Sequence, residues 1–142
     1  IQLTKQANTN GAAGVVTNVG LRSAIAMYEQ IEHAIMFRIA AAALKGGDQI
    51  ASIRDQAEAS SINPNTVAKA YRDLEVMGLI YTRRGKGVSV AQGAKEIADK
   101  KTGEYLDKKL AEAAREAREA GWELSDVDAV VADAWKSKSP VY

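Results

Sequence analysis

The tetrapeptide NPNT at residues 63–66 is the clearest helix start in the chain, and it restricts what its neighbours can form. Asparagine is a preferred N-cap residue, and proline suits the first helical position because the N–H group it lacks has no partner there. Ser52, followed three residues later by Asp55, predicts the start of a short helix that extends to about residue 60. Two helices joined by the three residues 61–63 are typical of a helix-turn-helix.

Apolar residues at three- and four-residue spacing predict which helix faces are buried. In the helix that begins at residue 64 they are Val67, Ala70, Tyr71, Leu74 and Met77. In a helix predicted upstream, over residues 25–44, they are Tyr28, Ile31, Ile35, Ile39 and Ala42. We also expect Ile53 and Ala57 of the short helix to point inward.

Two short strands, at residues 79–82 and 88–90, are predicted next, and the loop RRGKG at 83–87 joins them into a hairpin. Although the whole chain has a net charge of only +1, residues 61–92 hold five basic residues against two acidic ones, Asp73 and Glu75. The basic residues are Lys69, Arg72, Arg83, Arg84 and Lys86. A helix-turn-helix followed by this hairpin, the wing, therefore carries a local basic surface.

The order of these elements predicts an interface with double-stranded DNA. The first turn of the second helix can enter the major groove, where Asn65 suits adenine and Thr66 suits thymine. Contacts of Ser52 and Arg54 on the preceding helix with phosphates would set the register, and the wing would add affinity from the neighbouring minor groove. The predicted DNA-binding residues are Ser52, Arg54, Asn63, Asn65, Thr66, Lys69, Arg72, Arg83, Arg84, Gly85, Lys86 and Gly87.

Residues 93–142 predict two further helices, one over 95–120 and one that starts at Ser125 with Asp128 three residues later. The last helix has an apolar stripe of Val127, Val130, Val131 and Ala134, flanked by Trp122 and Trp135. A two-helix hairpin is too small to enclose such a stripe, so we expect a homodimer formed through these helices. Two recognition helices about 34 Å apart would then meet successive major grooves of a palindromic site.

The predicted fold is mainly α with a small β-hairpin. Its parts are an N-terminal arm at 1–24, which starts with a short strand at 1–3, a winged helix-turn-helix domain at 25–92 and a C-terminal helical dimerisation segment at 93–142.

The segments MYEQIEHAI, LKGGD and SIRDQAEASSINPNTVAKAYRDLEVMGLIYTRRGKGVSV, within about Met27 to Val90, resemble the GntR family of bacterial transcription regulators. The spellings NPNTV and GLIYTRRGKG are similar to those of its YtrA-like subfamily. The resemblance implies a dimeric repressor, with DNA contacts on the same residues of the two helices and the wing. The chain departs from the family at Ala51, where proline is usual, and at Ala68, where a long polar residue is frequent.

The composition excludes much enzyme chemistry. The chain has no cysteine and a single histidine, His33, so we expect no catalytic residues, no metal site and no cofactor. An apolar run at 39–44 is far shorter than the ~20 residues of a membrane span, and we expect a cytoplasmic protein. A small-molecule effector is not predicted. The alternative function is a winged-helix module that binds an acidic protein partner through the basic wing.

Overall fold

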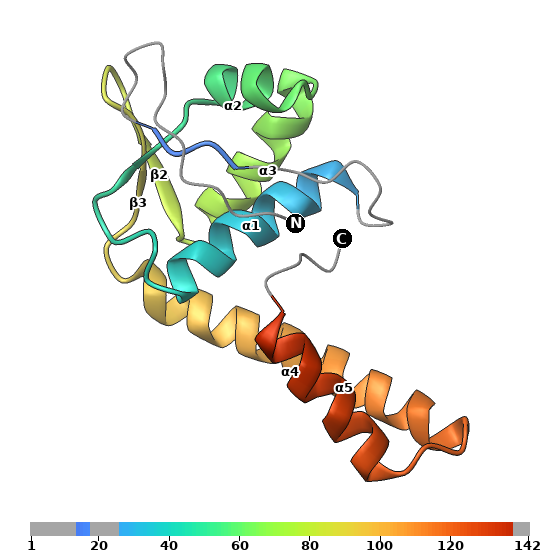
Figure 1. The fold of residues 1–142 in the computed structure, drawn as a ribbon. Helices are drawn as coiled ribbons and strands as arrows, with labels where there is room; N and C mark the ends of the chain where they lie inside the picture. Colours follow the sequence, from blue (N-terminus) through green and yellow to red (C-terminus); the bar gives the residue numbers. More distant parts are fainter. Residues whose placement is uncertain (1–13, 18–25, 138–142) are drawn as a thin grey trace.

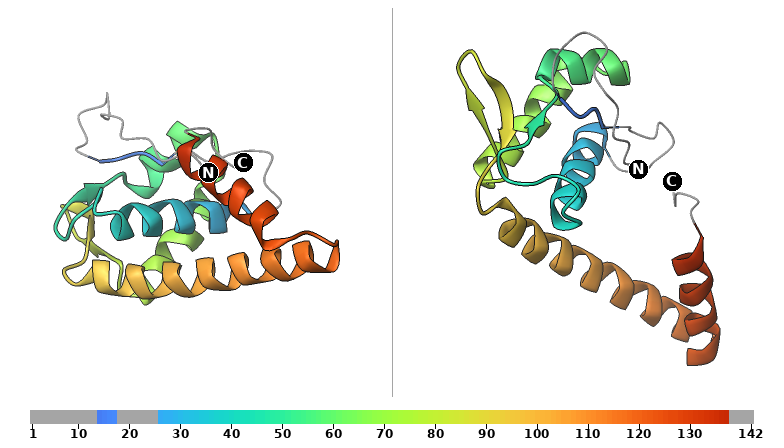
Figure 2. Two further views of the ribbon diagram at one scale, coloured as in Figure 1. Left: turned by 60° about the horizontal axis from the view of Figure 1, so that its bottom comes forward. Right: turned by 60° about the vertical axis from the view of Figure 1, so that its left-hand side comes forward.

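The computed structural model describes residues 14–17 and 26–137 of the 142-residue chain. Helices α1 (Met27–Ala40), α2 (Ile53–Ser60) and α3 (Pro64–Val76) pack with a small antiparallel sheet into a winged domain. Helix α4 (Ala94–Glu119) then runs away from this domain, and α5 (Leu124–Lys136) turns back at an angle from the far end of α4 (Figure 1 and Figure 2). The mainly α fold with a winged helix-turn-helix and a two-helix tail is thus confirmed.

The core of the winged domain lies between α1, α3 and the sheet. The predicted stripes of α1 and α3 supply most of its large, fully buried apolar residues, Ile31, Ile35, Ile39, Val67 and Leu74, and Leu79 adds another. Two expectations were wrong. Ile53 is 36% exposed, because it is the first residue of α2 and precedes the buried turn of that helix. Helix α1 ends at Ala40, and Ala42, with φ of 60°, lies exposed in the following turn.

The two helix starts of the helix-turn-helix form as expected. The Ser52 hydroxyl accepts a hydrogen bond from the Asp55 backbone N–H at 3.0 Å, and Asn63 Oδ1 accepts one from the Asn65 N–H at 2.8 Å. Between them, Ser61 adopts the left-handed conformation that ends α2 and turns the chain toward α3. These local bonds fix the start of both helices, which is why the sequence pattern located them within a residue.

The sheet has one more strand than the hairpin predicted. Strands β2 (Ile80–Arg83) and β3 (Gly87–Val90) form the wing, and β1 (Gln49–Ile50) pairs with the other edge of β3. The order is β1-β3-β2, with Ile50 opposite Val88. A two-residue strand is too short to leave an alternating pattern, so nothing in the sequence indicated it.

Part of the predicted N-terminal arm packs on the winged domain. Val15 forms a parallel bridge with Ile50, and Val16 and Thr17 are buried. The strand expected at residues 1–3 lies outside the described residues.

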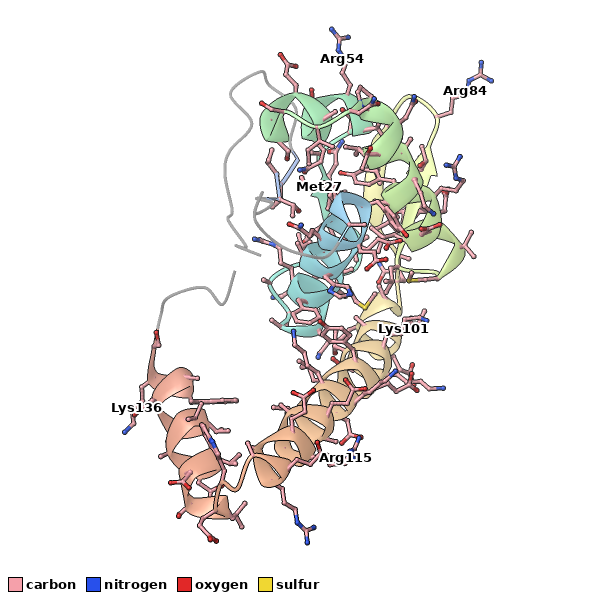
Figure 3. The ribbon with its side chains drawn as sticks, turned by 90° about the vertical axis from the view of Figure 1, so that its right-hand side faces the viewer. Met27, Arg54, Arg84, Lys101, Arg115 and Lys136 are labelled. Atoms are coloured by element: carbon pink, nitrogen blue, oxygen red, sulfur yellow. The ribbon has the colours of Figure 1, made fainter. Side chains whose placement is uncertain are left out.

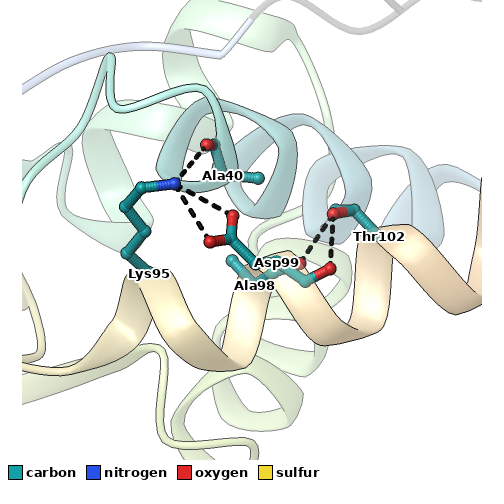
Figure 4. A network of polar contacts seen from close by, with 5 residues as sticks. All are labelled: Ala40, Lys95, Ala98, Asp99 and Thr102. Carbon is teal, nitrogen blue, oxygen red and sulfur yellow. Dashed lines mark hydrogen bonds and ion pairs between the residues drawn. The ribbon is translucent and has the colours of Figure 1, made fainter.

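Polar and aromatic contacts attach the first half of α4 to α1. The Lys95 ammonium donates to the Ala40 carbonyl at the end of α1 and to both carboxylate oxygens of Asp99, each at 3.0 Å (Figure 4). Farther along, the ring of Tyr105 packs edge-on against His33 and Phe37. Beyond these contacts, α4 continues away from the winged domain (Figure 2).

The N-cap of helix α5 lies two residues earlier than expected. Glu123 is the N-cap, and a capping box joins it to Asp126, whose Oδ2 accepts from the Glu123 N–H at 2.9 Å. The predicted pair, Ser125 and Asp128, lies inside the helix. Both pairs have the capping-box spacing, and in the structure the one nearer Gly121, which has φ of 86° and follows α4, forms the cap.

Candidate nucleic-acid interface

The starts of α2 and α3 both present polar side chains that are exposed or half-buried. Ser52 caps α2 with its oxygen, which leaves its O–H free to donate to a phosphate, and Arg54 is exposed in the first turn of the helix. At the start of α3, Asn65 is exposed and Thr66 is half-buried. Asn63 is exposed and acts as the cap of α3. Helix α2 packs directly on α3, so the two helices that carry these residues are neighbours.

The wing is a tight hairpin with three exposed cations. Its turn is closed by a hydrogen bond of 2.9 Å from the Lys86 N–H to the Arg83 carbonyl. Gly85 and Gly87 both have φ of 78°, a conformation that side chains with a Cβ rarely adopt. Arg83, Arg84 and Lys86 are exposed, and Figure 3 shows Arg84 projecting from the same end of the molecule as Arg54. The wing and α2 therefore offer positive charge to one ligand.

The wing also has a brace that the sequence did not indicate. Gln49 Nε2, on β1, donates to the Lys86 carbonyl at 3.1 Å, and a Cβ on Gly87 would lie only 2.9 Å from the same nitrogen. This contact joins the shortest strand to the turn that carries the cations. No sequence signal could have found it, because an exposed glutamine in an unpredicted strand has no expected partner.

The side chain of Lys69 already has two partners within the winged domain. Its ammonium lies 3.3 Å from Asp73 Oδ2 on the next turn of α3 and 4.4 Å from the centre of the Tyr28 ring on α1. Arg72 is exposed on the outer face of the same helix. Of the predicted site residues, Arg54 and Arg84 thus project from the same end of the molecule, whereas the side chain of Lys69 is directed toward Tyr28 on α1.

Behind Lys69, two carboxyl groups meet between α1 and α3. Glu32 is buried, and this burial, together with a hydrogen bond to Asp73, raises its pKa to about 8. The same hydrogen bond lowers the pKa of Asp73 below its usual value. At neutral pH, Glu32 is therefore protonated and donates to the ionised Asp73, which also attracts Lys69.

The single histidine belongs to the packing between helices. The His33 ring stacks on Phe37 with ring centres 5.8 Å apart and meets Tyr105 at 4.7 Å, and burial lowers its pKa. Across residues 14–17 and 26–137, no three metal-ligating side chains come together. Nor does this part of the chain contain a helix long and apolar enough to cross a membrane.

Comparison with known proteins points to one family. The model of the bacterial regulatory proteins of the gntR family matches residues 27–90. The transcriptional regulator YhcF of Bacillus subtilis is 37% identical over 84 residues, which cover 57% of this chain and 69% of that protein. The transcriptional repressor YtrA of the same organism is 35% identical over 103 residues, which cover 72% of this chain and 79% of YtrA.

A solved structure extends the likeness beyond the winged domain. The crystal structure of a transcriptional regulator from Oenococcus oeni has a TM-score of 0.61 and 30% identity, and covers 82% of this chain and 99% of the other. That coverage is wider than the stretch matched by the family model, so the similarity includes part of the tail. The chain belongs to the GntR family, whose members are DNA-binding transcriptional regulators and not enzymes.

Proposed function

We propose that this regulator is a cytoplasmic, dimeric repressor that occludes promoter DNA at a palindromic site. The observation that carries the proposal is that Arg54 and Arg84 project from the same end of the molecule (Figure 3), while Asn65 is exposed at the start of α3. A helix tip with adjacent cations can read base edges in the major groove while the cations contact phosphates on either side.

We assign different tasks to the parts of this surface. Asn65 and Thr66 discriminate between bases, because amide and hydroxyl groups match the donors and acceptors of base edges. Ser52 and Arg54 bind the phosphate backbone. Asn63, the cap of the recognition helix, and Arg72, within that helix, lie at the edge of the contact with DNA. The wing contributes affinity through Arg83, Arg84 and Lys86, and Gly85 and Gly87 allow its backbone to approach the duplex. Lys69 reaches DNA only if it leaves Asp73.

Dimerisation through the tail is supported by the apolar surface of α4 and α5. No residue of α5 is buried, and Trp122 and Trp135 are 47% and 89% exposed. The two helices line an apolar groove of about 550 Å³, bounded by Leu110, Ala113, Ala114, Ala117, Trp122, Val127, Val130, Val131, Ala134 and Trp135. An apolar face of this kind is typical of an interface. A second copy of the chain is the occupant we propose, because twofold symmetry would also pair the two DNA-binding surfaces.

Repression is supported by similarity to YtrA, which is named a transcriptional repressor. A repressor bound at a promoter can act by occluding that DNA, and this is the mechanism we propose.

Selection of duplexes from random DNA by the purified full chain tests the function. We expect enrichment of a palindrome whose half-sites are separated by about one helical turn, roughly 10 base pairs. A control chain with Arg83, Arg84 and Lys86 all changed to Ala should enrich nothing under the same conditions. The proposal would be contradicted if the parent chain enriched no sequence and bound an acidic protein through the wing instead.

A further inference from the structure

The side chain of Gln56 on α2 holds the backbone of Thr17 on both sides. Its Oε1 accepts from the Thr17 N–H at 2.9 Å, and its Nε2 donates to the Thr17 carbonyl at 2.8 Å. The second hydrogen of Nε2 is directed at Ser60 Oγ, at 2.6 Å, and that hydroxyl donates to the same carbonyl at 3.3 Å. An amide side chain thus pairs with residue 17 as a neighbouring strand would.

The four residues 14–17 lie very close to the link between β1 and α2. The Ala51 N–H donates to the Val15 carbonyl at 3.3 Å, next to the bridge between Val15 and Ile50. A Cβ added to Gly14 would lie 2.5 Å from the backbone of Ala51. Only glycine permits this approach, because a backbone atom cannot move aside as the end of a flexible side chain can.

Helix α2 has few other buried contacts. Its only buried residues are Gln56 and Ala57, and among the helices it packs chiefly on α3. Ala57 contacts the apolar core, whereas the side chain of Gln56, which is fully buried, directs its hydrogen bonds to Thr17 and Ser60. Half of the buried side chains of α2 therefore serve the contact with residues 14–17.

We infer that Gln56 is a positioning residue for DNA binding: by fastening residues 14–17 to α2, it sets the placement of Arg54 on the DNA-facing surface. Arg54 lies two positions before Gln56 on the same two-turn helix, so a shift or tilt of α2 moves both. The inference rests on the proposed function, since it assigns Arg54 to a phosphate. It gives part of the N-terminal arm a role in affinity without any contact of its own with DNA.

Two variants break the contact from opposite sides. Gln56→Met keeps the length of the side chain and removes both hydrogen bonds to Thr17. Gly14→Ala leaves α2 untouched and forces residue 14 away from Ala51. Gly103→Ala is the matched control, because a Cβ there meets no atom within 4 Å and it lies outside the DNA-facing surface. Thermal unfolding of each full-length variant sets a temperature at which all of them are folded.

Binding is then measured on the duplex enriched by the parent chain, over a range of salt concentrations. We expect Gln56→Met and Gly14→Ala each to weaken binding about three- to tenfold, and Gly103→Ala to leave it unchanged. The slope of log Kobs against log salt should become less steep by the amount that Arg54→Ala produces, about 0.9 for each phosphate that is no longer neutralised. Combined with Arg54→Ala, neither variant should weaken binding further.

Unchanged affinity in both folded variants would overturn the inference. The inference would also be overturned if the variants kept the parent's salt slope and their loss of affinity added fully to that of Arg54→Ala. Residues 14–17 would then affect binding by a route other than Arg54. If the parent chain itself binds no duplex, both the inference and the proposed function fail, and this result is seen before any variant is compared.

Discussion

The buried carboxyl group of Glu32 on α1 is hydrogen-bonded to the carboxylate of Asp73 on α3, the recognition helix. Two acidic groups can meet inside a domain only if one of them keeps its proton, and burial decides that Glu32 does. The contact lies on the side of α3 that faces α1, and Asp73 also attracts Lys69. The stability of this helix contact therefore depends on pH.

Replacement of Glu32 by Gln should remove that pH dependence. The folded-state pKa of Glu32, about 8, lies above its ordinary value of 4.5. Its contribution to stability is therefore fully present below about pH 4.5 and is lost as the pH rises to about 8. Glutamine still donates to Asp73 and cannot ionise, so Glu32→Gln should be more stable than the parent at pH 8 by on the order of 1 to 3 kcal/mol.

Urea unfolding at pH 5 and pH 8 measures this difference. Glu104→Gln, on the exposed surface of α4, is the control for removal of an acidic group and should change neither value much. Parallel pH profiles for the parent and Glu32→Gln would show that the two carboxyl groups do not share a proton.

Tyr71→Phe should destabilise the winged domain without altering its shape. The buried Tyr71 hydroxyl donates to the Ala51 carbonyl at 2.7 Å, and burial raises the pKa of the phenol. Phenylalanine leaves that carbonyl unpaired, at a cost of about 1 to 2 kcal/mol in the free energy of unfolding. Chemical denaturation measures the cost, and Tyr81→Phe on β2 serves as control. Equal stabilities of the Tyr71 variant and the parent would mean that water replaces the missing donor.

Val131→Asp should separate the proposed dimer. Val131 is 48% exposed and lines the apolar groove between α4 and α5, where a buried charge without a partner is costly. We expect the dissociation constant of the dimer to rise at least about a hundredfold, as measured by analytical ultracentrifugation. Val76→Asp, on an 84% exposed residue of α3, adds the same charge outside the groove and should leave the dimer intact. A dimer that tolerates Val131→Asp would place the interface elsewhere.

Asn65→Ala and Arg84→Ala should both weaken DNA binding, but only Asn65→Ala should change the base preference. Loss of Asn65 should weaken binding to the selected duplex by about 1 to 3 kcal/mol and relax the preference at one base position. Loss of Arg84 should weaken binding to selected and scrambled duplexes alike, because a phosphate contact carries no sequence information. Competition binding with single-base variants of the site distinguishes the two. Uniform, sequence-independent losses of affinity from both substitutions would refute the assigned tasks.

The parts of the fold that depend on local chemistry could be predicted from the sequence. The cap at Asn63 with Pro64 behind it, and the apolar spacing of α3, act within one or two helical turns and leave a readable pattern. The same holds for the glycines of the wing, whose positive φ is a local requirement.

Contacts between distant segments could not be predicted. Three such contacts are the pairing of β1 with β3, the Gln49 brace and the contact of Gln56 with Thr17. The brace and the Gln56 contact join residues 37 and 39 positions apart, and β1 is a strand of only two residues. Lys69 has the sequence position of a DNA contact, but its ammonium pairs with Asp73 one turn along the same helix and lies over the ring of Tyr28, which only the packing of α1 on α3 brings near. Tertiary packing, and not local preference, decides such cases.

The salt dependence of binding to the selected duplex shows whether the helix tips and the wing form a single DNA-binding surface. We expect log Kobs to fall linearly with log salt, with a slope of roughly −4 or steeper for a dimer that contacts several phosphates. Arg84→Ala should make that slope less steep, because one cation fewer then neutralises a phosphate. A nearly flat slope, or one that Arg84→Ala leaves unchanged, would mean that the helix tips and the wing do not bind DNA as a single surface.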